Sequence, residues 1–177
     1  MFYCTEYLSE IGVLTLASDG EAVCGLWIEG QKYHGDTVPQ PMERDEQAGG
    51  FAEMRTWLDA YFAGERPRVD SVPLAPIGTD FRQAVWRILL EIPYGETTTY
   101  GEIAEQIHAE RGKASPLAVG GAVGHNPISI IIPCHRVVGS NGSLTGYAGG
   151  LAKKKWLLEH EGVDMSGLFV PKRGTAL

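Results

Sequence analysis

The order of hydrophobic and polar residues differs between the two parts of the chain. Residues 11–28 contain two apolar runs separated by a Ser-Asp-Gly turn at residues 18–20, which predicts a β-hairpin. Residues 51–62 carry their large apolar side chains at helical spacing, and Gly64 follows as a typical helix end. The first part is therefore predicted to be a small sheet with one helix.

A proline-rich segment separates this part from the rest of the chain. Residues 65–78 contain prolines at positions 67, 73 and 76. Proline removes a backbone donor and fixes φ, so we expect an extended linker. The predicted division is an N-terminal domain with its linker at residues 1–77 and a C-terminal domain at residues 78–177.

The C-terminal part begins with repeated helix signals. An apolar stripe from Phe81 to Ile92 follows Asp80, which we expect to cap that helix. Residues 99–102 (Thr-Tyr-Gly-Glu) form a capping-box pattern, and residues 115–116 (Ser-Pro) are typical of a further helix start. Two helices joined by a short turn predict a helix-turn-helix.

The pattern then changes to a strand and a glycine-rich loop. Residues 128–132 (Ile-Ser-Ile-Ile-Ile) predict a buried strand that runs into Cys134, and a glycine-rich loop follows at residues 146–150. A last helix is expected from Leu151 to Glu161. The predicted fold class is α/β (α+β), with an N-terminal small sheet plus a helix and a C-terminal helical domain containing a winged helix-turn-helix-like unit.

The helix after Pro116 consists almost entirely of small residues. Its glycines, at positions 120, 121 and 124, each cost about 1 kcal/mol of helix stability relative to alanine. One interpretation is close packing against a neighbouring element. The other is a helix slim enough to lie in the minor groove of DNA, where a bulky recognition helix does not fit.

Composition narrows the class of protein. With 44% hydrophobic and 21% charged residues, the 177-residue chain has the balance of a folded protein rather than a disordered or coiled-coil one. No apolar run reaches the roughly 18 residues of a membrane helix, and the first residues lack a signal-peptide pattern. We therefore expect no membrane association and a cytoplasmic location.

The charge is unevenly distributed. The whole chain carries −7, but residues 1–77 hold 5 basic and 13 acidic side chains (−8), whereas residues 78–177 hold 10 and 9 (+1). The near-neutral second part is compatible with DNA binding of modest, salt-sensitive affinity. Lys153, Lys154 and Lys155 are expected to form a solvated helix face, with a phosphate contact as the alternative.

Cys134 is the candidate for chemistry. The chain has three cysteines and no CxxC motif, so a disulfide framework is not expected and an inert buried thiol is one interpretation. The other is a nucleophile, because Cys134 ends an apolar strand next to His135, a base for its proton. Neighbouring side chains of a strand point to opposite faces, so His135 would act through a water molecule. A carboxylate that holds the imidazole is then needed, and Glu161 is one candidate.

The residues around Cys134 resemble a known family. Ile-Pro-Cys-His-Arg-Val at residues 132–137 is similar to the signature of the O6-alkylguanine-DNA alkyltransferases, the methylated-DNA–protein-cysteine methyltransferases. Residues 92–104, 118–151 and 154–162 resemble further blocks of this family, in its order. The resemblance covers nearly all of the chain from residue 80 to residue 162, and the N-terminal part resembles the family's variable domain only loosely.

The resemblance implies a suicide DNA-repair protein that acts without a cofactor. Such a protein rotates a damaged guanine out of the duplex and transfers the O6-alkyl group to its own cysteine, here Cys134, with O4-alkylthymine as a further substrate. His135 would deprotonate the thiol through water, and Glu161 would orient His135. Asn126 matches the residue that braces the turn before the active site. Tyr100 matches the tyrosine that donates to a ring nitrogen of the leaving guanine.

The resemblance also implies the binding residues and the partner. The partner would be double-stranded DNA bearing alkylated guanine, contacted from the minor-groove side by a monomer. The family commonly has an arginine where this chain has Leu117, and that arginine enters the duplex in place of the flipped base. Weaker DNA binding and flipping are therefore expected. The implied pocket residues are Val137, Tyr147, Ala148 and Gly149, and the implied DNA-binding residues are Tyr100, Leu117, Ala118, Gly121 and Arg136.

Three other functions agree less well with the sequence. An alkyltransferase-like protein, which binds lesions with weak or no transfer, lacks the acceptor cysteine. A transcription regulator of the adaptive-response type needs further domains, and a cysteine hydrolase would turn over its substrate. Cys4, Cys24 and His34 fit no zinc motif, so no metal is expected.

Overall fold

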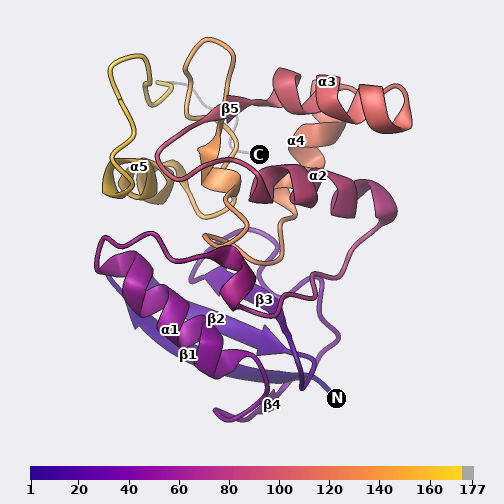
Figure 1. Ribbon diagram of the computed structural model, residues 1–177, viewed down its shortest axis with the longest axis vertical. Helices are drawn as coiled ribbons and strands as arrows, with labels where there is room; N and C mark the ends of the chain where they lie inside the picture. Colours follow the sequence, from indigo (N-terminus) through magenta and orange to yellow (C-terminus); the bar gives the residue numbers. More distant parts are fainter. Residues whose placement is uncertain (173–177) are drawn as a thin grey trace. The chain divides into compact units, whose positions relative to one another are not determined.

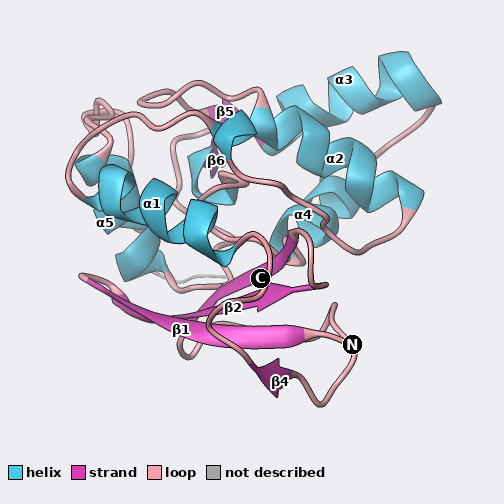
Figure 2. Cartoon of the chain, turned by 60° about the horizontal axis from the view of Figure 1, so that its bottom comes forward, coloured by secondary structure: helices cyan, strands magenta, loops and turns pink. Residues whose placement is uncertain are grey.

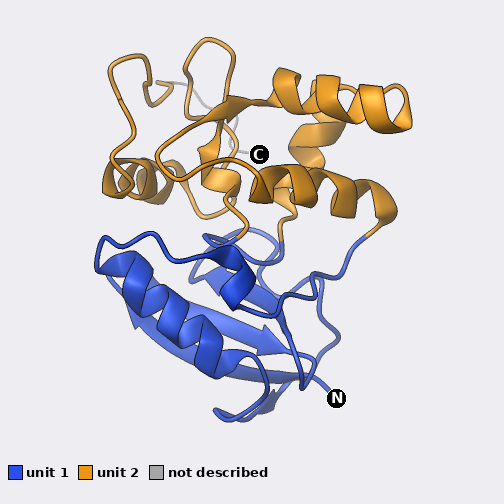
Figure 3. Ribbon diagram, viewed as in Figure 1, with its two compact units in different colours: residues 1–78, 127–131 blue, residues 79–126, 132–177 orange. Residues whose placement is uncertain are grey.

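The computed structural model describes residues 1–172 and divides into two compact units (Figure 3). Unit 1 comprises residues 1–78 together with residues 127–131, and unit 2 comprises residues 79–126 and the described chain from residue 132 onward. Residues 173–177, which end the predicted C-terminal domain, lie outside the described residues. The mixed α/β fold class expected from the sequence is confirmed, with a sheet in unit 1 and most helices in unit 2 (Figures 1 and 2).

Unit 1 is built on a four-stranded sheet with the strand order β3-β2-β1-β4. β1 (Tyr3–Ser9), β2 (Gly12–Ser18) and β3 (Val23–Ile28) are antiparallel neighbours, and the short β4 (Glu43–Arg44) pairs with β1 in parallel. β2 and β3 confirm the predicted hairpin. The sequence pattern does not predict β1 or β4, because most of their side chains are half-buried or exposed.

The predicted N-terminal helix is confirmed as α1 (Phe51–Phe62), which lies over one face of this sheet (Figures 1 and 2). Gly64 follows it with φ 86°, a left-handed conformation that favours glycine and ends the helix. Burial of a large apolar side chain contributes about 1.5–3 kcal/mol. The side chains that α1 buries are Phe51, Met54, Trp57, Leu58 and Tyr61.

The proline-rich segment is extended near its end but is not a free linker. It contains one short helical turn, η1 (Val69–Ser71). The backbone N–H of Val23 then donates to the carbonyl of Pro73 at 2.9 Å, and the N–H of Ala75 donates to the carbonyl of Val23 at 2.8 Å. Proline carbonyls still accept hydrogen bonds, so the segment packs along β3.

Residues 127–131 belong to unit 1, although they follow the helices of unit 2 in the chain. The N–H of Leu26 donates to the Pro127 carbonyl at 2.8 Å, and the N–H of Ser129 donates to the Leu26 carbonyl at 2.9 Å. The predicted strand over residues 128–132 is wrong, because Ile130 has φ 72° and turns the chain after a single bridge. The apolar run is buried, as predicted, but it forms a turn.

Unit 2 consists mainly of four helices within its described residues: α2 (Asp80–Leu90), α3 (Tyr100–Arg111), α4 (Pro116–Gly124) and α5 (Leu151–His160). A two-residue parallel pair, β5 (Thr98–Thr99) with β6 (Val137–Val138), lies beside them. α4 is joined to α3 by a short turn and is held to α2 by a hydrogen bond of 2.9 Å from the Trp86 indole N–H to the Ala122 carbonyl. None of the helices in the described chain is both long and apolar enough to cross a membrane.

The helix starts follow the local sequence with one correction. Ser115 caps α4, with Pro116 in its first turn, and Thr99 forms a complete capping box with Glu102 at the start of α3, as predicted. α2 is capped by Thr79, whose hydroxyl accepts from the backbone N–H of Arg82 at 3.3 Å. The predicted cap, Asp80, is instead the first helical residue, where its carboxylate is stabilised by the helix dipole.

The Thr99 capping box offers a direct test of this arrangement. Thr99→Ala removes the acceptor for the N–H of Glu102 and should lower the free energy of unfolding of unit 2 by about 1 kcal/mol. Urea denaturation followed by circular dichroism measures this change. Thr56→Ala is the matched control, since the Thr56 hydroxyl only donates back to the Ala52 carbonyl within an exposed part of α1. An equal loss in both variants would contradict the capping role of Thr99.

Candidate active site

Cys134 lies in a single helical turn, η2 (Cys134–Arg136), and its side chain is almost completely buried. The expectation that Cys134 ends a strand is wrong, because Pro133 has ψ 63° and takes the chain out of the extended conformation. Strand alternation therefore does not separate Cys134 from His135. The backbone N–H of Cys134 donates to the Ile132 carbonyl at 2.8 Å, which fixes the turn that carries the sulfur.

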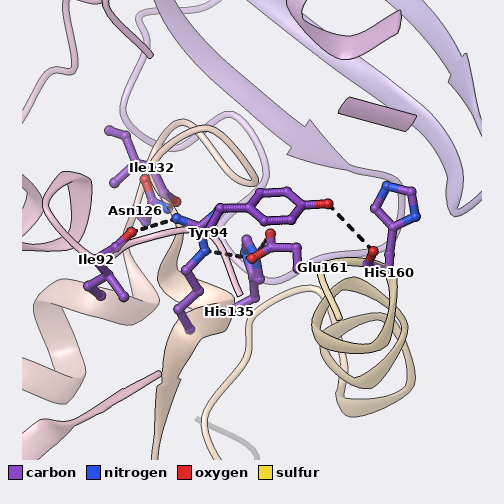
Figure 4. Close-up of polar contacts among 8 residues, drawn as sticks. Ile92, Tyr94, Asn126, Ile132, His135, His160 and Glu161 are labelled. Atoms are coloured by element: carbon purple, nitrogen blue, oxygen red, sulfur yellow. Dashed lines mark hydrogen bonds and ion pairs between the residues drawn. The ribbon is translucent and has the colours of Figure 1, made fainter. Parts of the chain in front are cut away.

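His135 and Glu161 form a buried hydrogen-bonded pair (Figure 4). Nε2 of His135 lies 2.6 Å from Oε2 of Glu161, and both side chains are fully buried. A carboxylate only accepts hydrogen bonds, so Nε2 carries the hydrogen. Burial lowers the pKa of His135 by more than Glu161 raises it, so the ring is neutral and Nδ1 holds a lone pair. Within the described part of the chain, Nδ1 has no hydrogen-bond partner.

Glu161 also binds Arg136. It caps the end of α5, and its Oε1 accepts from Nε of Arg136 at 2.7 Å. Burial alone would favour the neutral acid, but His135 and Arg136 outweigh it and hold the pKa of Glu161 well below its usual range. The carboxylate is therefore ionised, with one oxygen for each partner.

The structure places the side chain of Arg136, for which the resemblance implied DNA binding, inside the protein. Its side chain is only 10% exposed, and Nη1 donates to the Ile92 carbonyl at 2.7 Å. The guanidinium also lies 5.7 Å from the ring centre of Tyr94, within range of a cation–π interaction. Because carboxylate, carbonyl and ring occupy it inside the protein, the guanidinium is not presented to a phosphate.

Asn126 spans the chain before the active site. It follows the end of α4, and its Nδ2 donates to the Ile132 carbonyl at 2.7 Å (Figure 4). Burial raises the pKa of the Cys134 thiol, and a hydrogen bond with the Asn126 side chain and the charge of Lys154 partly oppose this. The structure thus brings Asn126 to Cys134, while His135 and Glu161 form their buried pair directly after it.

The implied pocket residues lie in and after β6. Val137 and Tyr147 are buried, and Ala148 and Gly149 are half-buried. The hydroxyl of Tyr147 is buried, and no hydrogen-bond partner for it is found among residues 1–172. Burial raises the pKa of Tyr147, so this hydroxyl is a neutral donor.

Tyr100 opens α3 and points to the same loop. Its hydroxyl donates to the Thr145 carbonyl at 3.0 Å. Burial, with a smaller contribution from Cys134, raises the pKa of Tyr100 well above its usual range. Tyr100 is therefore a neutral donor that is currently directed at the protein backbone.

Lys154 is the residue that the sequence analysis missed. The lysine run was expected to be solvated, but the Lys154 side chain is fully buried, whereas Lys155 is exposed. Its ammonium donates to the carbonyls of Val137 and Thr145. The spacing of the sequence contained a signal for this burial. Residues 151, 154, 158 and 161 recur on one side of the helix, and the last of them is the buried Glu161.

α4 presents its small residues outward. Leu117 is 87% exposed, and Ala118 and Gly121 are also exposed. A methyl group on Gly121 would meet no atom within 4 Å, and one on Gly120 would only touch the Tyr100 ring at 3.9 Å. Packing inside the protein therefore does not require glycine at either position, which removes the first of the two interpretations of this helix there.

The described residues contain no group of three or more histidine, cysteine or acidic side chains placed to hold a metal ion. Cys4, Cys24 and His34 are among the residues covered by this statement.

Comparison with known proteins matches nearly the whole chain to the family that the sequence resembles. Residues 80–163 match the DNA binding domain of 6-O-methylguanine DNA methyltransferase, and residues 2–76 match its ribonuclease-like domain. The methylated-DNA–protein-cysteine methyltransferase of Methanosarcina acetivorans is 49% identical over 161 residues, covering 90% of this chain and 98% of the relative. The Mycobacterium tuberculosis protein of the same name is 50% identical over 153 residues, covering 86% and 88%.

Solved structures agree. The crystal structure of Mycobacterium tuberculosis O6-methylguanine methyltransferase gives a TM-score of 0.77 at 45% identity, covering 98% of this chain and 97% of that one. The structure of Mycobacterium tuberculosis OGT in complex with DNA gives 0.76 at 46% identity, covering 90% and 91%. With both domains matched and relatives of this identity along its length, the chain belongs to the 6-O-methylguanine DNA methyltransferase family.

Proposed function

We propose that this chain repairs alkylated DNA by transferring the alkyl group from O6 of guanine, and from O4 of thymine, to the sulfur of Cys134. The observation that carries the proposal is the buried pair in which Glu161 fixes the ring of His135, the residue after Cys134, and leaves Nδ1 as a proton acceptor. The relatives named methylated-DNA–protein-cysteine methyltransferase support the same reaction.

The chemistry follows from these groups. His135 Nδ1 takes the thiol proton through a water molecule while the thiolate attacks the alkyl carbon. The S–C bond forms as the C–O bond breaks, and the electron pair of that bond stays on the guanine. Tyr100 turns its hydroxyl to the guanine ring nitrogen, so that the proton lost by the thiol is replaced, in net terms, on the base. The products are guanine and a Cys134 thioether, which leaves each protein molecule with one turnover.

The α4 surface supports binding of the duplex from the minor-groove side. The alkylated oxygen lies inside a duplex, so the base must leave the stack to reach a buried sulfur. Glycines that have no internal packing role keep α4 slim, and the exposed Leu117 is an apolar wedge of the kind that minor-groove proteins insert between base steps. The DNA complex of the Mycobacterium tuberculosis relative supports DNA as the partner.

The alternative, an alkyltransferase-like protein that binds lesions without repairing them, is not favoured. Such a protein needs no acceptor thiol and no base. This chain has Cys134, and the residue after it, His135, is hydrogen-bonded to the buried carboxylate of Glu161.

The first test of this function is the mass of the protein after reaction. Incubation with a duplex containing O6-methylguanine should add one methyl group, and peptide mapping should locate it on Cys134. Cys134→Ser should bind the duplex but not react, because a hydroxyl is far less easily ionised than a thiol. Cys24→Ser removes a buried thiol elsewhere in the chain and should react normally. Methyl on Cys4 or Cys24 would overturn the assignment of Cys134.

The pair of His135 and Glu161 predicts non-additive losses. His135→Ala and Glu161→Gln should each slow single-turnover transfer by about a hundredfold or more, since general base catalysis contributes 10²–10⁴-fold. The double variant should be little slower than either single variant, because the two residues act as one unit. Glu159→Gln, at an exposed position two residues before Glu161, is the matched control and should leave the rate unchanged. Multiplied losses in the double variant would show that the residues act independently.

The α4 surface predicts opposite effects of two substitutions on duplex binding. Gly121→Ala should raise the free energy of unfolding by up to about 1 kcal/mol and yet weaken binding, since the added methyl group projects from the exposed face. Leu117→Arg should tighten binding and steepen its salt dependence by up to about one unit in the log–log slope. Fluorescence anisotropy with a labelled duplex at several salt concentrations measures both.

Reaction with free O6-benzylguanine is the control for these two variants, because a free base needs no flipping. Its rate should be unchanged in both. Duplex binding that is unaffected by either substitution would remove α4 from the DNA interface.

A further inference from the structure

Lys154 differs from its neighbours on α5 in being completely buried. Its relative exposure is 0%, whereas the Lys155 side chain is 52% exposed and forms a surface ion pair of 3.7 Å with Glu159. A lysine is almost never fully buried unless it is paired, because removing an ammonium from water costs several kcal/mol. The environment of Lys154 must therefore compensate its charge.

The hydrogen bonds of Lys154 all lead to the acceptor site. One carbonyl that it binds belongs to Val137, three residues after Cys134. The other belongs to Thr145, at 2.9 Å, and the same Thr145 oxygen accepts from the Tyr100 hydroxyl at 3.0 Å. One ammonium group thus joins β6, the loop that precedes the pocket residues and, through the shared Thr145 carbonyl, the tyrosine that the proposed function directs at the leaving base.

These contacts are with neutral groups and leave the charge itself unbalanced. Within the described chain, no carboxylate forms an ion pair with Lys154. Glu161, the buried acid of this site, has one oxygen on His135 and the other on Arg136. With Glu161 and Arg136 cancelling and His135 neutral, the buried cluster carries one net positive charge while Cys134 is a thiol.

Cys134 is the group on which this charge acts. Burial lowers the pKa of Lys154 to about 8, and the charge of Cys134 opposes that change. In return, Lys154 partly offsets the rise that burial causes in the pKa of Cys134. At neutral pH Lys154 is therefore an ammonium that favours the anionic form of the sulfur.

We propose that Lys154 is a positioning residue of the alkyl-acceptor site, whose buried ammonium holds the Val137 and Thr145 carbonyls and supplies the positive charge that stabilises the Cys134 thiolate. The proposal rests on the proposed function for its biological meaning. The two parts of the role are separable, because a lost hydrogen bond slows the reaction equally at all pH values, whereas a lost charge slows it only where the wild-type Lys154 is an ammonium.

The experiment compares Lys154→Met, which removes the charge, with Lys154→Arg, which keeps it, and with Lys155→Met as the matched control on the exposed side of α5. The rate of Cys134 alkylation is measured from pH 6 to pH 9 with free O6-benzylguanine and, separately, with iodoacetamide, the product being located by peptide mapping. Iodoacetamide alkylates any thiolate, so this arm does not depend on the proposed function.

The loss of the charge is expected to change how the reaction rate depends on pH. Without the ammonium, the thiolate fraction falls at neutral pH, and each tenfold fall is partly offset, by about threefold, through the higher nucleophilicity of the more basic thiolate. Lys154→Met should therefore react about threefold more slowly or worse near pH 7, and should approach the wild-type rate as the pH rises above 8, where the wild-type ammonium also loses its proton. Lys155→Met should follow the wild-type profile throughout. Lys154→Arg should match the wild type near pH 7 and react faster than it above pH 8, because a guanidinium keeps its charge there.

Other charged or titratable groups around the sulfur also bear on this profile. Lys154 slightly lowers the pKa of His135, so removing Lys154 raises that pKa. More of His135 is then protonated at low pH and cannot take the thiol proton, so this effect also slows the reaction of Lys154→Met at low pH. The remaining groups, which are unchanged in these variants, are Arg136 and Glu161 behind His135, Tyr100 of α3 and Tyr147 of the pocket loop.

Each outcome bears on the proposal. A loss in Lys154→Met that is the same at every pH, or no loss, would overturn the charge role. If Lys154→Met does not fold, Lys154→Gln carries the same test, because its amide still offers two N–H donors without the charge. If wild-type protein reacts with iodoacetamide in the expected pattern but not with O6-benzylguanine, the proposed function fails while the role of Lys154 stands.

Discussion

The carboxylate of Glu161 is the interaction on which the site depends. It is buried and ionised, and its two oxygens receive His135 and Arg136 at 2.6 and 2.7 Å. Removing one partner of such a buried set leaves an uncompensated charge, which typically costs 3–5 kcal/mol. The same bond that selects the reactive tautomer of His135 therefore also holds the end of α5 to η2, and Arg136 extends this support to the Ile92 carbonyl at the end of the α2 region. The carboxylate of Glu161 therefore supports both the reactivity of the site and its local stability.

The path of the chain explains how Cys134 keeps its place. After α4 the chain leaves unit 2 at Asn126, pairs with β3 through residues 127–131, and returns at Ile132. Asn126 closes this excursion with its hydrogen bond to the Ile132 carbonyl. The beginning of the cysteine segment is thus tied to the end of the helix that the proposal places on DNA. Asn126 therefore has a structural role at this site, although its amide does not react.

Much of the fold could be predicted from local patterns, whereas parts of the site could not. The β2–β3 hairpin, α1, and the starts of α3 and α4 follow from turn residues, apolar spacing and caps, which act within a few residues. The docking of residues 127–131 on β3 depends on long-range pairing that no local pattern encodes. β1 pairs with the neighbouring β2, but it lacks the apolar pattern that would have predicted a strand. The resemblance of the hexapeptide pointed to Cys134 and His135, and the block at residues 154–162 contains Glu161. The buried ion pair of Arg136 with Glu161 could not be predicted from either.

Three places where the sequence breaks local rules lie on the segments around Cys134. Ile130, a β-branched residue, adopts φ 72°; Gly120 and Gly121 weaken a helix that has room for alanine; and Lys154 occupies a position of the buried stripe of α5. Each departure lowers stability in the isolated protein, and nothing in the packing of its own element requires it. Such violations concentrate where function constrains a sequence. These three departures lie on the helix before Cys134, on the segment that leads to it and on the helix that follows it, so their cost in stability falls on parts that the alkyl transfer uses. Tyr33, with φ 59° in the loop after β3, is a departure that lies outside them.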